Sequence, residues 1–292
     1  MEWSVTGSKV LATSSGITHR NGRVLVAGGP GCGIIDPFES RTGVDTEAAR
    51  YNNDPPIRSS IAKVVAISYP SAIIQPMMTN KLSKTSKLGT KSWSLQAIET
   101  CPGSVGANGK LVPACSGCYA TTGMYHFGAV KAVRADNKAA WAEDGWVADM
   151  VAQLKKDTHF RWFDSGDMYS LELATKMYQV MVRTPNTKHW LPTRMAKFPK
   201  FQPILAAMQR LPNVMVRFSS DAVDGTFTAG VHGSTIVPDA EGAPGGVQVC
   251  PAYNQGGKCL TCRACYDKSV AVIGYPAHGK KMAKVIRLAV AA

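Results

Sequence analysis

Residues 159–191, HFRWFDSGDMYSLELATKMYQVMVRTPNTKHWL, contain a strand, a helix and a second strand in succession. The aromatic-rich run at 159–163 and the short apolar run at 188–191 are typical of strands. Between them, residues 170–183 repeat apolar side chains at helical spacing, for example at Leu173, Ala174 and Met177. This order predicts two parallel strands joined by a helix that packs on the sheet.

The same alternation continues through most of the chain from about residue 90. We expect further strands at 92–98, 213–218 and 269–274, and further helices at 119–143, 146–156 and 200–210. The pattern predicts an α/β fold with mainly parallel strands, built either as an open doubly wound sheet or as a partial (β/α) barrel. We assign residues 76–245 to a partial barrel, and residues 246–292 to a Cys-rich loop region that carries the last strand.

Residues 1–75 are expected to form a β-rich extension. Short β-like runs lie at 9–12, 23–27 and 63–68, and Asn21-Gly22 is a hairpin signal. The glycine-rich segment 28–33 lacks the Lys-Ser/Thr ending of a phosphate-binding loop, so we interpret it as a turn, which leaves Cys32 unassigned. Asp54-Pro55-Pro56 is the expected linker.

Composition and charge restrict the function classes. Apolar residues make up 45% and charged residues 18% of the 292 residues, which is typical of a globular protein. No run approaches the roughly 20 apolar residues of a membrane span, so we expect a cytoplasmic protein without a membrane partner. The net charge of +13 favours a nucleic-acid partner. Lysines gather at 81–91 and at 280–284, although such runs are also typical of solvated surfaces.

Seven of the eight cysteines fall into two groups. Reduced cytosolic cysteines are more often ligands than disulfides. The first group is Cys101, Cys115 and Cys118, between a predicted strand and helix. Three thiolates can hold a [4Fe–4S] cluster with one iron open to a ligand, whereas a closed zinc site needs four ligands. His126 would supply the fourth ligand in the zinc alternative.

The second group is Cys250, Cys259, Cys262 and Cys265. Its closely spaced Cys-x2-Cys steps share a middle cysteine and resemble ferredoxin-type ligation. Structural zinc more often uses two separate Cys-x2-Cys pairs. A second iron–sulfur cluster is therefore favoured over zinc.

Polar groups follow three predicted strands, in segments 161–167, 190–194 and 216–221. Each segment places a charge and a hydroxyl after an apolar run, which suits a pocket for a zwitterionic or phosphorylated small molecule. Arg194 is one of the candidate cofactor-binding residues. Alternatively, Asp164 or Asp167 caps the following helix and the arginines pair with carboxylates at the rim.

Five segments carry a family resemblance: SKLG (86–89), CSGCYA (115–120), DSGD (164–167), WLPTR (190–194) and CRAC (262–265). Through them, residues 88–278 resemble the phage "gene product 88" family of uncharacterised proteins. The resemblance implies a phage or prophage origin, and hence the cytoplasm of an infected cell. It implies no particular activity.

A three-cysteine loop after the first strand of a β/α repeat, followed by Tyr119-Ala120, also resembles the radical S-adenosylmethionine superfamily. That resemblance implies a cluster on the first cysteine group that binds S-adenosylmethionine. It places Ser165, Gly166 and Asp167 at the cofactor's amino group, Arg217 or Ser219 near its ribose, and an auxiliary cluster on the second group. The superfamily has three residues between its first two cysteines, where this chain has thirteen.

These observations lead to a specific hypothesis and one rival. The hypothesis is an iron–sulfur enzyme with a radical S-adenosylmethionine-like partial barrel, acting on a nucleic acid or nucleotide. The rival is a non-catalytic, metal-stabilised nucleic-acid-binding protein that uses its basic charge. Zinc in place of iron would instead indicate a zinc-stapled interaction protein.

Overall fold

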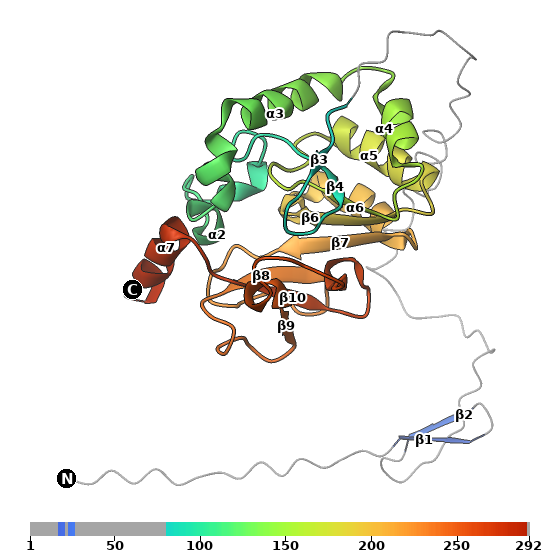
Figure 1. The fold of residues 1–292 in the computed structure, drawn as a ribbon. Coiled ribbons are helices and arrows are strands. Elements are labelled where there is room, and N and C mark those ends of the chain that lie inside the picture. Colours follow the sequence, from blue (N-terminus) through green and yellow to red (C-terminus); the bar gives the residue numbers. More distant parts are fainter. Residues whose placement is uncertain (1–16, 21–22, 27–79, 291–292) are drawn as a thin grey trace. The chain divides into compact units, whose positions relative to one another are not determined.

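This computed structural model describes residues 17–20, 23–26 and 80–290 (Figure 1). The chain divides into two units, residues 1–71 and residues 72–292. In the first unit, β1 (Ile17–Arg20) and β2 (Arg23–Val26) pair antiparallel with Arg20 opposite Arg23. This register confirms the hairpin predicted from Asn21-Gly22. The expected strands 9–12 and 63–68, the turn with Cys32 and the linker 54–56 lie outside the described residues.

The second unit is built on one mainly parallel sheet. Its strands, in spatial order, are β3 (Ser83–Lys84), β4 (Lys91–Trp93), β5 (His159–Trp162), β6 (Lys188–Thr193), β7 (Val214–Ser219), β8 (Gly233–Val237), β10 (Val272–Pro276) and β9 (Val247–Val249). Only β3 and β4 pair antiparallel; every other neighbouring pair in this sheet is parallel. The predicted mixed α/β fold with mainly parallel strands is confirmed.

Strands β4 to β8 follow one another in both chain order and spatial order. The connections carry α3 (Gly128–Ala140) and α4 (Trp146–Leu154) before β5, α5 (Leu171–Arg183) before β6, and α6 (Gln202–Arg210) before β7. Right-handed crossovers between successive parallel strands place their helices on the same face of a sheet. In agreement, α5 contacts both α4 and α6 (Figure 1). From β4 to β8 the strand order has no reversal of the kind that defines a doubly wound sheet, and the chain order reverses only at β10 and β9.

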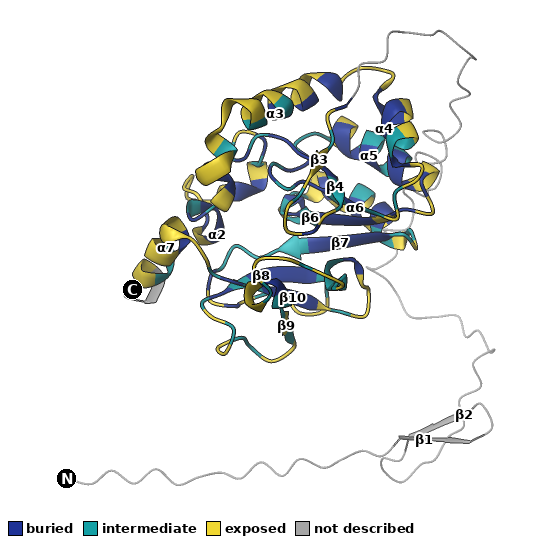
Figure 2. Cartoon of the chain, viewed as in Figure 1, coloured by how far each residue is buried: buried dark blue, intermediate teal, exposed yellow. Residues whose placement is uncertain are grey.

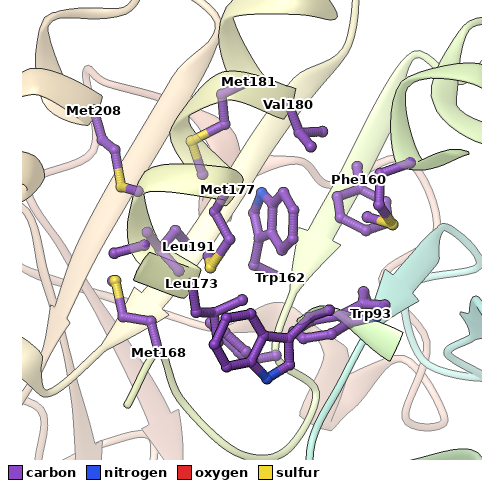
Figure 3. Packing of buried hydrophobic residues seen from close by; sticks show 14 of the residues in the cluster. Trp93, Phe160, Trp162, Met168, Leu173, Met177, Val180, Met181, Leu191 and Met208 are labelled. Carbon is purple, nitrogen blue, oxygen red and sulfur yellow. The ribbon is translucent and has the colours of Figure 1, made fainter. Parts of the chain in front are cut away.

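The largest hydrophobic core lies between this helical layer and the sheet. Phe160 and Trp162 point from β5 into the core, where they meet Leu173 and Met177 of α5 (Figure 3). Helix α5 begins after Ser170, whose hydroxyl accepts a hydrogen bond from Leu173 N. Full burial of each such side chain contributes about 1.5–3 kcal/mol. Figure 2 shows this buried layer beneath exposed outer helix surfaces.

The sheet also has a second face, which carries Arg161, Trp190 and Arg217. These residues alternate along their strands with Trp162, Leu191 and Val216 of the large core. The second face is covered by chain segments without regular helices, including the loop that contains Tyr266. Both faces of the parallel sheet are therefore covered, as parallel sheets require.

Several elements differ from the sequence-based expectations. The predicted strand 92–98 is only the three-residue β4. The predicted continuous helix 119–143 is wrong at its start, where η3 (Tyr119–Thr121) and η4 (Gly123–His126) precede α3. Gly123 has a φ of +59°, which a continuing right-handed helix does not allow. Strands β8 and β9 and helix α7 (Lys280–Val290) were not expected. Among the described residues, no helix has the length and apolar character to cross a membrane.

Candidate functional site

The first cysteine group lies on the connection that follows β4. Cys101 precedes η2 (Pro102–Ser104), Cys115 lies in α2 (Pro113–Ser116), and Cys118 precedes η3. Cys118 N donates to Cys115 O at 3.1 Å. Burial raises the pKa of the Cys101 thiol to about 12, and the charges of Asp167, Cys115 and Cys118 add to this shift. The charges of Cys115 and Cys118 therefore act on Cys101, although thirteen residues separate Cys101 from Cys115.

Two strained turns flank this group. Ile98 has a φ of +68° although it is β-branched, and its carbonyl accepts a hydrogen bond from Cys101 N at 3.1 Å. Phe163 has a φ of +54° at the end of β5, just before the DSGD segment. Such conformations cost about 1–3 kcal/mol each and persist where the surrounding structure imposes them. Both turns position backbone that borders the three thiols.

A carboxylate and two cations lie beside Cys115. Lys197 Nζ is 2.5 Å from Asp221 Oδ2, and it also donates to Gly103 O at 2.8 Å. Arg194 Nε is 3.4 Å from Asp221 Oδ1, yet both atoms are buried and without a hydrogen-bond partner in the described part of the chain. Burial raises the pKa of Cys115, and the nearby Arg194 and Lys197 charges oppose that rise. Lys197 was not among the residues expected at a site, and Asp221 was expected only as part of the strand-end segment 216–221.

Asp167 connects the ends of two strands beneath the thiols. Its carboxylate accepts hydrogen bonds from Thr193 Oγ1 at 2.8 Å, Arg194 N at 2.9 Å and Met168 N at 2.8 Å. Burial raises its pKa to about 6, against the opposing effect of these hydrogen bonds. Asp167 N in turn donates to Thr100 O, next to Cys101. The predicted proximity of the DSGD segment and Arg194 is therefore present.

Ser165 and Gly166 shape the same loop. Ser165 Oγ donates to Leu95 O at 2.6 Å and accepts from Arg134 Nε. Gly166 has a φ of +82°, and a Cβ there would lie 2.6 Å from Leu95 Cβ and 2.7 Å from Thr100 Oγ1. These two residues hold the loop against the cysteine-bearing connection, and the Ser165 hydroxyl is already used in two hydrogen bonds.

Arg217 has a different role from the one implied by the resemblance to the radical S-adenosylmethionine superfamily. Its side chain is fully buried on the second face of the sheet. It donates to the carbonyls of Gly233, Ala264, Cys265, Asp267, Val270 and Ala271. Because its donors are all used to hold the cysteine-rich loop, Arg217 has none left for a ribose. Ser219 is half-buried at the end of β7, opposite Ser234.

The second cysteine group surrounds a single small pocket on that same face. Cys250, Cys259, Cys262 and Cys265 all line it, together with Leu88 and Ile273. Cys265 Sγ and the Tyr275 hydroxyl share a hydrogen bond of 3.3 Å, and Cys259 N donates to Lys87 O at 2.8 Å. Burial raises the pKa of the Cys259 and Cys265 thiols. Cys250 and Cys259 thus meet although eight residues separate them.

A polar chain runs between the two cysteine groups. Arg161 stacks on Trp190 at 4.6 Å and donates to Asp164 Oδ1 at 2.9 Å and to the Tyr119 hydroxyl at 3.3 Å. Tyr119 directly follows Cys118. The i,i+3 spacing of Arg161 and Asp164 was visible in the sequence, but the approach of Tyr119 was not.

The spacing of these groups bears on the kind of metal that they fit. Within residues 17–20, 23–26 and 80–290, no three His, Cys, Asp or Glu side chains are placed to hold one metal ion. Tetrahedral zinc would bring its sulfur ligands to about 3.8 Å of one another, given zinc–sulfur bonds of about 2.3 Å. His126 Nε2 is hydrogen-bonded to Thr121 O at 2.5 Å, which leaves Nδ1 as the ring nitrogen that is free to bind a metal in the zinc alternative. In a cluster each thiolate binds a different iron, which requires a wider spacing.

Comparison with known proteins identifies a family but no activity. No curated protein and no solved structure matches the chain. The sequence model described as Gene product 88 matches residues 73–268, about two thirds of the chain. The match spans both cysteine groups and the strand-end loop at Asp167. This extent of similarity shows that the chain belongs to the Gene product 88 family.

Proposed function

We propose that this protein binds two iron–sulfur clusters, one on each cysteine group. The observation that carries the proposal is the gathering of thiols from distant segments into two separate sets, of three and of four. Sulfur is the preferred donor of iron–sulfur clusters, and four thiolates close such a site whereas three leave an iron accessible. The second group would then be structural and the first reactive.

A metal and the nearby cations both favour the thiolate form of the first cysteine group. Burial raises the pKa values of Cys101 and Cys115, so without a metal these two thiols stay protonated. A bound metal centre reverses this preference, because it stabilises thiolates and releases their protons. Arg194 and Lys197 supply additional positive charge next to Cys115.

Occupation of the second group requires a local movement. Its pocket measures about 20 Å³, which is space for about one water molecule. A cluster would therefore push outward the loop that carries Cys259 and Cys262. Leu260 in this loop is 63% exposed, so the loop can move without opening the main core.

The more specific proposal is that the sheet curves as a partial barrel and that the first site binds S-adenosylmethionine. The chain order of β4 to β8 supports it, as does the position of the first cysteine group after β4. The DSGD loop and Arg194 follow β5 and β6 at the same edge of the sheet. A bound cluster would supply the electron for reductive cleavage of the cofactor. Arg194 Nε is buried, lies 3.4 Å from Asp221 Oδ1 and makes no hydrogen bond within the described residues, so it would have a donor for a carboxylate of the cofactor.

Anaerobic purification with iron and sulfide analysis tests the clusters. We expect about eight irons per chain, falling by about four in Cys101→Ser and by about four in Cys262→Ser, because each variant opens one cluster. Cys32→Ser is the matched control, since Cys32 belongs to neither group, and should keep all its iron. Zinc in place of iron, or iron loss that does not follow the two groups, would refute the proposal.

A separate measurement tests the cofactor. Reconstituted protein with dithionite should convert S-adenosylmethionine to methionine and 5′-deoxyadenosine, and Cys115→Ser should abolish this conversion. Arg194→Gln should weaken cofactor binding about tenfold, the value of one hydrogen bond to a charged group. Protein with intact clusters and no conversion would overturn the cofactor proposal while leaving the iron–sulfur proposal standing.

A further inference from the structure

A polar cavity lies at the amino ends of β4 and β5, at the opposite edge of the sheet from the first cysteine group. Its lining comes from three short segments: Lys84, the turn Gly89-Thr90-Lys91, and Asp157-Thr158-His159. The cavity measures about 260 Å³, which corresponds to roughly nine water molecules. It is therefore large enough for a small polyatomic ligand.

The lysines of segment 81–91 differ in whether their ammonium groups have a partner. Lys81 pairs with Asp136 at 2.5 Å, Lys91 pairs with Asp157 at 2.8 Å, and Lys87 lies over the Tyr275 ring. The Lys84 ammonium makes no hydrogen bond or ion pair with any residue of 80–290, and Lys84 lines the cavity beside Lys91. The only carboxylate in the lining, that of Asp157, is already neutralised by Lys91. The cavity thus has an uncompensated cation and no free acid.

Hydroxyl groups and further positive charges also lie at or near the cavity. Thr158 Oγ1 lies 3.0 Å from His159 Nδ1, and the Thr90 hydroxyl is 3.4 Å from the Tyr266 hydroxyl. Burial lowers the pKa of His159, and the positive charges of Arg263 and Lys188 lower it further. The charges near the cavity are therefore mainly positive, and its lining includes two threonines and a histidine beside Lys84 and Lys91.

We propose that this cavity binds a phosphate group, held by Lys84 with the Thr90 and Thr158 hydroxyls, while His159 Nδ1–H donates to Thr158 Oγ1 and orients that hydroxyl. A compact ammonium is a good partner for the charge of a phosphate, and hydroxyls can donate to its remaining oxygens. A carboxylate would leave most of these donors unused. The site does not involve either cysteine group, so it stands or falls independently of the iron–sulfur proposal.

Titration calorimetry on the full-length protein tests the site. Inorganic phosphate and adenosine monophosphate should bind, whereas adenosine should not. Lys84→Gln and Thr158→Val should each weaken phosphate binding about tenfold, the value of one hydrogen bond to a charged group. Lys131→Gln is the matched control, because it removes the same charge from the exposed surface of α3. It should leave the affinity unchanged.

A second set of titrations decides whether the phosphate belongs to a nucleotide or to a nucleic-acid backbone. If the phosphate belongs to a nucleotide, adenosine monophosphate should bind at least as tightly as inorganic phosphate, and a single-stranded oligonucleotide should not compete. If it belongs to a nucleic-acid backbone, the oligonucleotide should bind with a salt dependence that decreases in Lys84→Gln but not in Lys131→Gln. Absence of phosphate binding, or equal weakening by Lys84→Gln and Lys131→Gln, would overturn the proposal.

Discussion

His189 is a buried residue whose protonation the fold resists. It lies in β6 with no exposed surface, and Trp162 Nε1 donates to its Nδ1 at 3.2 Å. The proton must therefore be on Nε2, which lies 2.9 Å from Thr184 Oγ1, and that hydroxyl donates onward to Val180 O at 2.7 Å. Burial lowers the pKa of His189 to about 3. The neutral ring is a structural component of the core.

This lowered pKa predicts an acid-sensitive fold. Above about pH 6.5, His189 is neutral in both the folded and the unfolded state. Between about pH 6.5 and 3 only the unfolded state binds the proton, so the free energy of unfolding should fall by about 1.4 kcal/mol per pH unit from this residue alone. Urea unfolding at pH 7, 6 and 5 measures this slope. His189→Gln should lower stability at pH 7 but flatten the slope; an unchanged slope would contradict the assignment.

At the scale of elements, α7 closes over the first cysteine loop. Met282 is buried against Ala114 and Val223, and Lys281 Nζ donates to Thr121 Oγ1 at 2.7 Å. A Cβ at Gly117, between Cys115 and Cys118, would lie 2.6 Å from Met282 Cε. Glycine is needed at this position because of the helix that packs on it, since the φ of Gly117 is an ordinary −94°.

A double-mutant cycle tests this contact. Gly117→Ala should destabilise the protein by about 1–3 kcal/mol through overpacking, and Met282→Ala by about 2–5 kcal/mol through the cavity that it leaves. In the double variant the added methyl enters the space vacated by Met282, so the combined loss should be smaller than the sum. Urea unfolding measures the three values. Strict additivity would mean that α7 does not pack on Gly117 in solution.

Elements with a strong internal pattern were predictable, and elements that depend on distant partners were not. Helix α5 begins and ends close to the predicted bounds because its cap and apolar spacing lie within the segment itself. Strand β9 has only three residues and exists through pairing with β10. Helix α7 was not predicted, and its lysines were noted only as a basic run that is also typical of a solvated surface. Its apolar residues pack on Ala114 and Val223, which are far away in the sequence.

At the scale of the whole molecule, metal loading should order the two cysteine-bearing regions and leave the helical core unchanged. Hydrogen exchange of iron-loaded and iron-free protein measures this difference. We expect greater protection at residues 98–121 and 258–266 when iron is bound, because each segment then carries metal–sulfur bonds. Residues 171–183 of α5, packed in the large core, serve as the internal reference. Equal changes in the core, or none in the cysteine regions, would argue against two local metal sites.

The sequence by itself determined the fold class and the grouping of the cysteines. Strand and helix periodicity is a local property, and closely spaced cysteines such as Cys259, Cys262 and Cys265 are recognisable without coordinates. Tertiary structure alone decided which distant groups meet: Cys101 with Cys115, Asp167 with the backbone of Arg194, and Arg217 with the carbonyls of the cysteine-rich loop rather than with a ligand site. It also singled out Lys84 from its neighbouring lysines. The physical reason is that burial, charge environment and hydrogen-bond saturation depend on segments far apart in the chain, and only packing brings these together.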